Sequence, residues 1–314
     1  MEKKYRVGLI GVGSIAHIAH LPALSARTDV ELVGAFAEHI ESVQRTQKSY
    51  AIQKAVHNMD ELLDIGLDCA FVLSPKTVHA EQVIRLLEAK VDVFCEKPMG
   101  MTLKEAYDMA DASARTGKKL MIAFNRRYAP VYRKAKEVYG ELAPDVLIAQ
   151  KNRPASEYRA TLENAIHMVD ILRYFCGECT KIDACSKFTD PLYETLATAQ
   201  LQFENGSVAM LVADRASGQW VETLEMHGHN RSVLVNCPDT ITITDNEQSH
   251  TTSMTPLAYG WARVIDKMGF TQEVDHFFDC LKNNQEPLTS GADSYKTQEL
   301  MHRILTAAGL PGLE

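Results

Sequence analysis

The chain has 314 residues, a net charge of −8 and a pI near 5.8, and 46% of its residues are hydrophobic. This length suffices for two domains, and the absence of a Lys/Arg block argues against nucleic acid or an anionic membrane as a partner. No apolar run reaches the roughly 18 residues that span a bilayer, and the charged N-terminus is unlike a secretory signal, so we expect a cytoplasmic protein with no membrane contact.

The stretch from Tyr5 to Leu24 predicts a strand, a glycine-rich turn and a helix. Gly11 allows the tight turn, Gly13 leaves the backbone open to a pyrophosphate, and Ala16 keeps the helix close to the strand. The helix N-terminus then offers free N–H groups and a partial positive charge to phosphates. We therefore predict a dinucleotide site, against the alternative of a structural turn without a ligand. Apolar residues recur at helical spacing after the turn (Ile15, Ile18 and Ala19).

The tip of the second predicted strand, residues 30–37, bears on the choice of dinucleotide. In NAD-binding folds an acidic residue at this tip bonds the ribose hydroxyls. Glu38 is placed to do so, whereas the small Ala37 together with His39 would leave room for the 2′-phosphate of NADP. No Arg follows directly to bind that phosphate, so both cofactors stay open.

Strands and helices alternate as far as residue 123. This alternation predicts a parallel sheet that is covered by helices on both faces, in a first domain of residues 1–123. Functional residues in such sheets follow the C-terminal ends of strands, which is where Ser74 and Glu96-Lys97-Pro98 fall. Further strands are expected at 69–73, 92–95 and 119–123, and helices at 60–64, 78–89 and 103–116, with the capping pairs Asn58–Glu61 and Thr102–Glu105.

After Phe124 the pattern changes to closely spaced strands joined by turns. Glu204-Asn205-Gly206 predicts a hairpin turn between two of them. The pattern predicts a second domain of α+β type with an antiparallel sheet, in residues 124–314, whose C-terminal helix can pack back on the first domain. Its strands are expected at 147–151, 181–187, 194–203, 207–214, 221–227, 232–236 and 240–244, and its helices at 130–139, 159–175, 270–282 and 292–308.

Two groups of residues outside the glycine-rich turn are typical of catalysis. Lys97 follows Glu96 at a strand end, where its ammonium can point into a cleft; the alternative is a surface ion pair. Glu163 and His167 are four residues apart on a predicted helix, so the carboxylate can orient the imidazole for proton transfer. The alternative is a satisfied His on a half-buried helix. Asp170 also falls near that face.

The chain has seven cysteines, and two of them form the pair Cys176-x-x-Cys179. No second pair of Cys or His follows at the spacing of a zinc site, and the pair lies where a helix ends at a glycine. We interpret it as packing at a helix end and predict no metal site.

Taken together, four motifs resemble the Gfo/Idh/MocA oxidoreductase family. They are Gly11-Val12-Gly13-Ser14-Ile15-Ala16, Glu96-Lys97-Pro98, Phe124-Asn125-Arg126-Arg127-Tyr128 and His167-Met168-Val169-Asp170. The run Asn125 to Pro130, with Tyr259-Gly260-Trp261 and Met268-Gly269-Phe270, is similar to the MviM-like branch of that family.

The resemblance implies a doubly wound Rossmann domain followed by a domain with an open-faced, mainly antiparallel sheet, often used to form homo-oligomers. It implies that Lys97 reaches nicotinamide and substrate, and that His167 acts with an acidic residue four positions earlier, here Glu163 where the family has Asp. The Asp that the family has at the second strand tip is replaced by Ala37. Implied contacts with NAD or NADP are Gly11, Gly13, Ser14, Ile15, Ala37, Glu38, His39, Ser74, His79, Glu96, Lys97 and Arg127.

These observations predict an NAD(P)-dependent dehydrogenase or reductase acting on a secondary alcohol or carbonyl of a sugar, polyol or related small molecule. His167 would take the hydroxyl proton, Lys97 would stabilise charge on the substrate oxygen, and Glu163 would orient His167. The alternative is a non-catalytic regulatory or sensor protein that binds a dinucleotide on the same fold.

Overall fold

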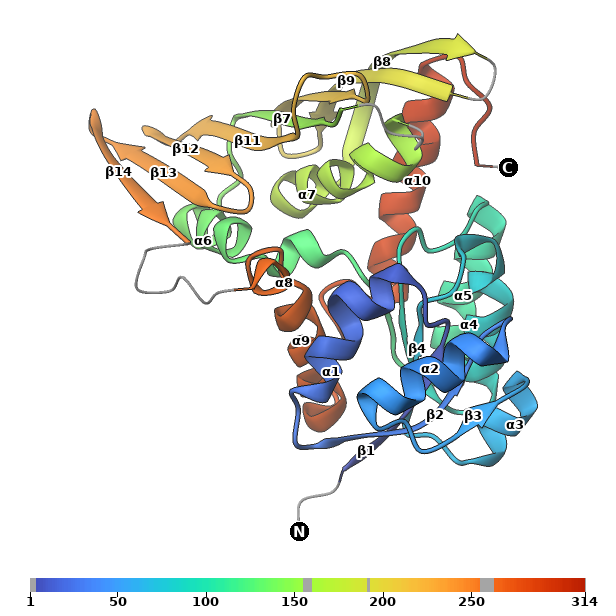
Figure 1. Ribbon diagram of the computed structural model, residues 1–314. Coiled ribbons are helices and arrows are strands. Elements are labelled where there is room, and N and C mark those ends of the chain that lie inside the picture. The colour runs from blue at the N-terminus through green and yellow to red at the C-terminus, as the bar shows by residue number, and fades with distance from the viewer. Residues whose placement is uncertain (1–3, 155–159, 191–192, 255–262, 314) are drawn as a thin grey trace. The chain divides into compact units, whose positions relative to one another are not determined.

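The computed structural model describes residues 4–154, 160–190, 193–254 and 263–313 (Figure 1). The chain divides into two compact units. The first unit contains Met1–Phe124 and Phe270–Lys296, and the second contains Asn125–Gly269 and Thr297–Glu314. The segment Phe270–Lys296 therefore groups with the N-terminal residues, and the division into domains at residues 123 and 124 stays a prediction.

A six-stranded parallel sheet forms the centre of the first unit, in the order β3-β2-β1-β4-β5-β6. The short apolar runs suit this position, because all four residues of β4 are buried. The chain proceeds outward on both sides of the β1–β4 pair, which creates the switch point where such sheets bind ligands. The strands are β1 (Tyr5–Ile10), β2 (Val30–Phe36), β3 (Ala55–Val56), β4 (Cys69–Val72), β5 (Asp92–Cys95) and β6 (Leu120–Ile122).

Both predicted capping pairs of the first unit are confirmed. The Glu61 N–H donates to Asn58 Oδ1 at 2.9 Å, and the Glu105 N–H donates to Thr102 Oγ1 at 3.1 Å. The helices of this unit are η1 (Ala16–His20), α1 (Leu21–Ser25), α2 (Ile40–Tyr50), α3 (Met59–Asp64), η2 (Lys76–Val78), α4 (His79–Glu88), α5 (Leu103–Thr116) and α9 (Phe270–Asn283).

The first helix differs from the expected α-helix, because η1 is a π-helix. A π-turn closes over five residues instead of four, so side chains after it are rotated relative to α-helical spacing. Ile18, expected on the apolar face, is accordingly 65% exposed, whereas His20 is fully buried.

An eight-stranded sheet dominates the second unit, in the order β14-β13-β12-β11-β7-β10-β9-β8. It is mainly antiparallel, as predicted, but β7 and β10 pair in parallel. The predicted turn at Gly206 joins the antiparallel strands β9 and β10. The strands are β7 (Val146–Asn152), β8 (Cys179–Asp190), β9 (Tyr193–Phe203), β10 (Val208–Asp214), β11 (Val221–Gly228), β12 (Arg231–Asn236), β13 (Thr240–Asp245) and β14 (Gln248–Ser253).

Helices cover one face of this second sheet (Figure 1). Helix α7 packs on β7 and β10, and α6 packs on β12 and β13. Residues of β10 and β11 alternate between buried and more exposed positions, as expected when only one face of a sheet is covered. The remaining helices are η3 (Asn125–Tyr128), α6 (Pro130–Tyr139), η4 (Ala160–Ala165), α7 (Ile166–Cys176), α8 (Val264–Lys267) and α10 (Gly291–Ala307), which begins in the first unit.

Candidate active site

A pocket of about 650 Å³ lies at the carboxyl ends of β1, β2 and β4 in the first unit. It is lined by residues 10–15, 36–39 and 73–75, each of which directly follows or ends one of these strands. A pocket of this size at a switch point can hold a dinucleotide or a large part of one. Four further lining residues are not predicted by the sequence pattern, namely Ser42, Thr77, Val78 and Gln82.

The two glycines of the turn have different roles in this pocket. Gly11 has φ +88°, and a Cβ on it would lie 2.6 Å from the backbone nitrogen of Ser74. A Cβ on Gly13 would meet no protein atom within 4 Å. The fold therefore requires glycine at position 11, whereas position 13 borders open space that fits a pyrophosphate. Ser14 and Ile15, the other predicted residues of the turn, also line the pocket.

The predicted residues at the second strand tip line the same pocket. Ala37, Glu38 and His39 form its wall where α2 begins, and Ser42 lies in the first turn of that helix. The Ser42 hydroxyl accepts a hydrogen bond from Arg45 Nη2 at 3.0 Å. Arg45 thus lies about one helical turn beyond Ser42, whereas Glu38 lines the pocket at the tip itself, so the choice between NAD and NADP stays open.

Ser74 and His79 follow β4, and the structure assigns them different surroundings. Ser74 lines the pocket, and its hydroxyl donates to Gln82 Oε1 at 2.6 Å. His79 is buried, and its Nε2 and Nδ1 lie 3.0 Å from the main-chain oxygens of Ser74 and Pro98. The ring nitrogens of His79 therefore contact the protein backbone, and a contact with the cofactor stays a prediction.

Glu96 and Lys97 follow β5. The Glu96 carboxylate contacts the buried imidazole of His20, and the sequence pattern does not predict this contact. His20 Nε2 lies 2.7 Å from Glu96 Oε1, and Glu96 Oε2 accepts the Lys97 N–H at 3.1 Å. Burial by itself would raise the pKa of Glu96, but the hydrogen bond and charge of His20 and the charge of Lys97 hold it below its ordinary value. Glu96 is thus an ionised group inside the unit, and the Lys97 side chain is half-buried beside it.

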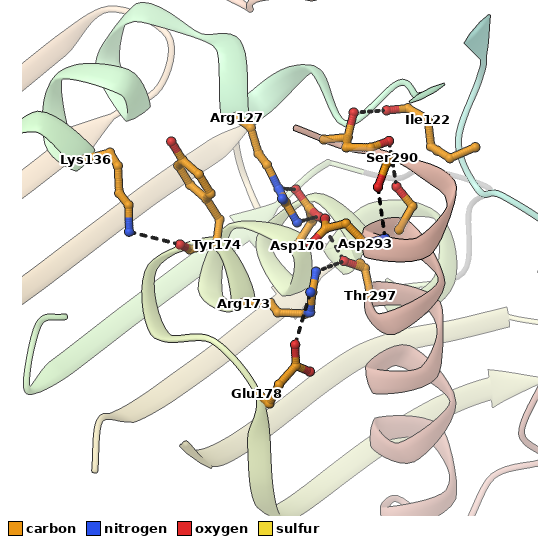
Figure 2. Close-up of polar contacts among 12 residues, drawn as sticks. Ile122, Arg127, Lys136, Asp170, Arg173, Tyr174, Glu178, Ser290, Asp293 and Thr297 are labelled. Atoms are coloured by element: carbon orange, nitrogen blue, oxygen red, sulfur yellow. Dashed lines mark hydrogen bonds and ion pairs between the residues drawn. The ribbon is translucent and has the colours of Figure 1, made fainter. Parts of the chain in front are cut away.

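In the second unit, Arg127 of η3 forms a bidentate ion pair with Asp170 of α7 (Figure 2). Arg127 Nε and Nη2 donate to the two carboxylate oxygens at 2.8 and 2.6 Å, and both residues are buried. Thr297 Oγ1 donates to the same carboxylate at 3.0 Å. The Arg127 guanidinium also lies 5.3 Å from the ring centroid of Tyr174. These contacts connect η3 to the helix that carries His167; a contact of Arg127 with the cofactor stays a prediction.

Glu163 and His167 lie on two different kinds of helix. Glu163 is in the π-helix η4, and His167 is the second residue of α7, where it is mostly buried. The expected helix over residues 159–175 is therefore a π-helix over 160–165 and an α-helix from residue 166, and residue 159 lies outside the described residues. Because a π-helix has more residues per turn, a spacing of four no longer guarantees a shared face. The orienting role of Glu163 stays a prediction.

A second buried charge cluster lies beneath the sheet of the second unit. Arg126 donates to both oxygens of Glu222 at 2.7 and 2.9 Å, and Lys151 also contacts that carboxylate. All three residues are buried. Burial and the charge of Arg126 lower the pKa of Lys151, whereas Arg126 and Lys151 outweigh burial and lower the pKa of Glu222. Asn164 donates to the Lys151 main-chain oxygen at 2.7 Å, so strand β7 contacts η4, the helix before His167.

The Cys176–Cys179 pair agrees with packing at a helix end. Cys176 is the last residue of α7, and burial raises the pKa of its thiol to about 12. Burial also raises the pKa of the Cys179 thiol. Thiols that resist ionisation are poor nucleophiles and poor metal ligands. Among the described residues, no group of three or more His, Cys, Asp or Glu side chains is arranged to hold a metal ion.

Two family models match the chain. The model described as "Oxidoreductase family, NAD-binding Rossmann fold" matches residues 5–124, and the "GFO/IDH/MocA C-terminal domain" matches residues 147–234. The chain belongs to the Gfo/Idh/MocA family of oxidoreductases. The family prediction is thereby confirmed, and the matched residues contain the pocket of the first unit, Lys97 and His167.

Named relatives and solved structures of the same fold agree with this assignment. The chain is 22% identical to scyllo-inositol 2-dehydrogenase (NAD(+)) of Bacillus subtilis, over 94% of this chain and 91% of that protein. A crystal structure of dehydrogenase MviM from Clostridium difficile has a TM-score of 0.86 and 24% identity, with 97% and 100% of the two chains covered. KijD10, a 3-ketoreductase from Actinomadura kijaniata in complex with NADP, has a TM-score of 0.81 and 19% identity, with 97% and 98% covered.

Several predictions about the Gfo/Idh/MocA protein are confirmed at the level of class. It has the predicted α/β fold, it is an NAD(P)-dependent dehydrogenase or reductase acting on CH–OH groups, and its cofactor is NAD or NADP. Of the motifs similar to the MviM-like branch, Tyr259-Gly260-Trp261 lies outside the described residues. None of the described helices has the length and apolar composition needed to cross a bilayer.

Proposed function

We propose that this enzyme transfers hydride between a nicotinamide dinucleotide and a secondary alcohol or carbonyl of a sugar, polyol or related small molecule. The observation that carries the proposal is the pocket at the switch point, with Gly13 open to a pyrophosphate and Lys97 following a strand of the same sheet. The name of the inositol dehydrogenase relative supports the substrate class.

The residues around the pocket fit the cofactor, and different residues would hold different parts of the dinucleotide. The turn from Gly11 to Ile15 would hold the pyrophosphate through main-chain N–H groups at the helix N-terminus. Ala37, Glu38 and His39 would hold the adenosine ribose or its 2′-phosphate, and Ser74 and Glu96 would contribute toward the nicotinamide half. The bound nicotinamide supplies the hydride chemistry.

The protein supplies proton transfer and charge stabilisation. His167 accepts the hydroxyl proton as the alcohol is oxidised and returns it in the reverse direction. Lys97 donates a hydrogen bond to the substrate oxygen and stabilises negative charge that develops there. Glu163 orients His167. The proposal requires Lys97 and His167 to act on the same substrate molecule.

Incubation with NAD⁺ or NADP⁺ and a panel of inositols, aldoses and glycosides tests this function, with reduced nicotinamide measured by absorbance. We expect turnover on at least one polyol or sugar, and a loss of roughly 10²–10⁴-fold in kcat for His167→Asn, as for removal of a general base. Tight cofactor binding without turnover across the panel would favour the sensor alternative.

We also propose that the enzyme is a homo-oligomer that pairs through the uncovered face of the second sheet. Met210 on β10 is 42% exposed and lies opposite Ile148 on β7, and Leu234 on β12 is 38% exposed. Apolar side chains gathered on one sheet face are typical of an interface. We expect Met210→Glu to lower the mass measured by light scattering, whereas Leu142→Glu, at an exposed apolar position outside the strands, leaves it unchanged.

A further inference from the structure

Two buried histidines from different helices contact the Glu96-Lys97-Pro98 segment after β5. His20 is the last residue of η1, and His79 is the first residue of α4. They are 0% and 1% exposed, and both belong to the first unit with the segment they contact. Two polar rings directed at one three-residue segment need a physical explanation, because a buried imidazole costs free energy unless it is hydrogen-bonded.

His20 contacts the segment through the Glu96 carboxylate. Because a carboxylate only accepts, His20 Nε2 donates the 2.7 Å hydrogen bond to Oε1, while Oε2 accepts the main-chain N–H of Lys97 at 3.1 Å. The His20 ring is enclosed by aromatic rings, with centroid distances of 5.2 Å to Phe94 and 5.8 Å to Phe270. The carboxylate is therefore held in one orientation, and with it the backbone at Lys97.

His79 contacts the residue that follows Lys97 in the segment. Its Nδ1 lies 3.0 Å from the main-chain oxygen of Pro98, and its Nε2 lies 3.0 Å from that of Ser74. Carbonyl oxygens only accept, so each ring nitrogen that carries a proton donates one of these bonds. The imidazole thus connects the residue after Lys97 to the end of β4, where Ser74 lines the cofactor pocket.

We propose that His20 and His79 are positioning residues that hold the backbone of Lys97 through the residues before and after it, Glu96 and Pro98, and so direct its ammonium at the substrate oxygen. Neither ring needs to touch substrate or cofactor in this role. The inference rests on the proposed function of Lys97. Its physical basis is that a misplacement of about 1 Å in a reacting group can lower the rate by about 10²-fold.

Paired substitutions at each histidine test the role, measured with a substrate found in the panel above. His20→Leu and His79→Leu keep the approximate volume but remove every donor, whereas His20→Gln and His79→Gln retain an amide N–H. We expect each Leu variant to lower kcat by roughly 10- to 100-fold, with the KM for the cofactor within about twofold, and each Gln variant to recover most of the loss. Where a Leu variant does not fold, the Asn variant at the same position is measured instead. The Asn side chain is shorter than that of Gln, so its amide does not reach the partner of the histidine.

His17→Leu is the matched control, because His17 lies on the same helix but contacts Thr46 Oγ1 at 3.1 Å; its kcat should equal that of the wild type. Lys97→Met separates the two proposals. Unchanged turnover in Lys97→Met removes the proposed role of Lys97 and with it the positioning role, whereas a wild type that turns over no substrate of the panel removes the proposed function. Two results would overturn the positioning role when Lys97→Met has lost activity. One is full activity in both Leu variants, and the other is an equal loss of activity in the Leu and Gln variants.

Crystal structures of the same variants give a readout that needs no substrate. We expect the backbone at Lys97 to move by about 1 Å in His20→Leu and to keep its place in His20→Gln. An unmoved backbone in both Leu variants would contradict the inference whatever their activity.

Discussion

The two units of this enzyme build their candidate site residues in different ways. In the first, the proposed cofactor pocket is made of backbone and small side chains that follow strand ends, such as Gly11, Gly13 and Ala37. In the second, η3 is held by buried ion pairs, in which Arg126 and Arg127 reach Glu222 and Asp170 across 96 and 43 residues of sequence. A backbone site depends on conformation at a few adjacent positions, whereas a buried ion pair depends on both partners being present.

The largest effect should follow loss of the shared carboxylate in the second unit. Glu222→Gln leaves Arg126 and Lys151 buried without the carboxylate that both contact, and we expect the free energy of unfolding to fall by about 3–5 kcal/mol. Urea denaturation monitored by circular dichroism measures this change. A loss below about 1 kcal/mol would show that water reaches these cations and that the ion pairs do not hold the second unit together.

Lys151→Met is the matched control at the same cluster. It removes one of two cations and leaves the bidentate Arg126–Glu222 pair intact, so we expect a change in the free energy of unfolding of at most about 1.5 kcal/mol in either direction. A loss as large as that of Glu222→Gln would contradict the idea that the carboxylate is the limiting partner.

Gly11→Ala should have the next largest effect, and it tests the backbone character of the first unit. The new Cβ would meet the Ser74 nitrogen at 2.6 Å in a left-handed conformation, so the end of β1 or β4 must shift. We expect a loss of at least about 2 kcal/mol in the free energy of unfolding, together with weaker binding of NAD(P). Thermal unfolding and cofactor titration measure the two effects, and an unchanged protein in both would refute the requirement for glycine.

Gly13→Ala should separate binding from stability. Its Cβ meets no protein atom within 4 Å, so the free energy of unfolding should stay within about 0.5 kcal/mol of wild type. The same methyl group would occupy space assigned to the pyrophosphate, and we expect the Kd for the cofactor to rise at least about tenfold, or about 1.4 kcal/mol. Isothermal titration with NAD⁺ and NADP⁺ measures this; unchanged affinity for both would place the phosphates elsewhere.

The smallest predicted effect concerns Glu96, the buried acid beside Lys97 in the first unit. The pKa of Glu96 lies below its ordinary value of 4.5 in the folded protein, so its ionised form contributes stability above that value. This contribution is lost as the pH falls through the lowered pKa. Between about pH 5 and about pH 3, the free energy of unfolding should therefore fall less steeply in Glu96→Gln than in wild type. Parallel slopes would contradict the lowered pKa.

Much of the first unit can be predicted from the sequence because its signals are local. The strand Asp92–Cys95 has the predicted bounds, and the pocket contains the predicted residues of the turn, the second strand tip and Ser74. β3 is not predicted, because its two residues are too few to show a pattern. The burial of His20 is not predicted either. Alpha-helical spacing predicts that Ile18 is buried, whereas in the π-helix η1 the buried residue is His20 and Ile18 is exposed.

In the second unit the elements are more predictable than their interactions. The helix Pro130–Tyr139 has the predicted bounds, whereas β14 is not predicted because Gln248–Ser253 is polar and does not alternate. Nothing local in the sequence connects Arg126 to Glu222 or Arg127 to Asp170. The sequence does contain charged residues at strand positions that face the core, such as Lys151, and these could have indicated a buried partner.

The most direct test of the central claim is a double-mutant cycle on kcat/KM with Lys97→Met, His167→Asn and the combined variant. Each single change should lower kcat/KM by roughly 10²–10⁴-fold. If both groups serve one hydride-transfer transition state, the combined variant should fall little below the worse single variant. Wild-type rates in either single variant, or a combined loss equal to the product of the two, would contradict the account.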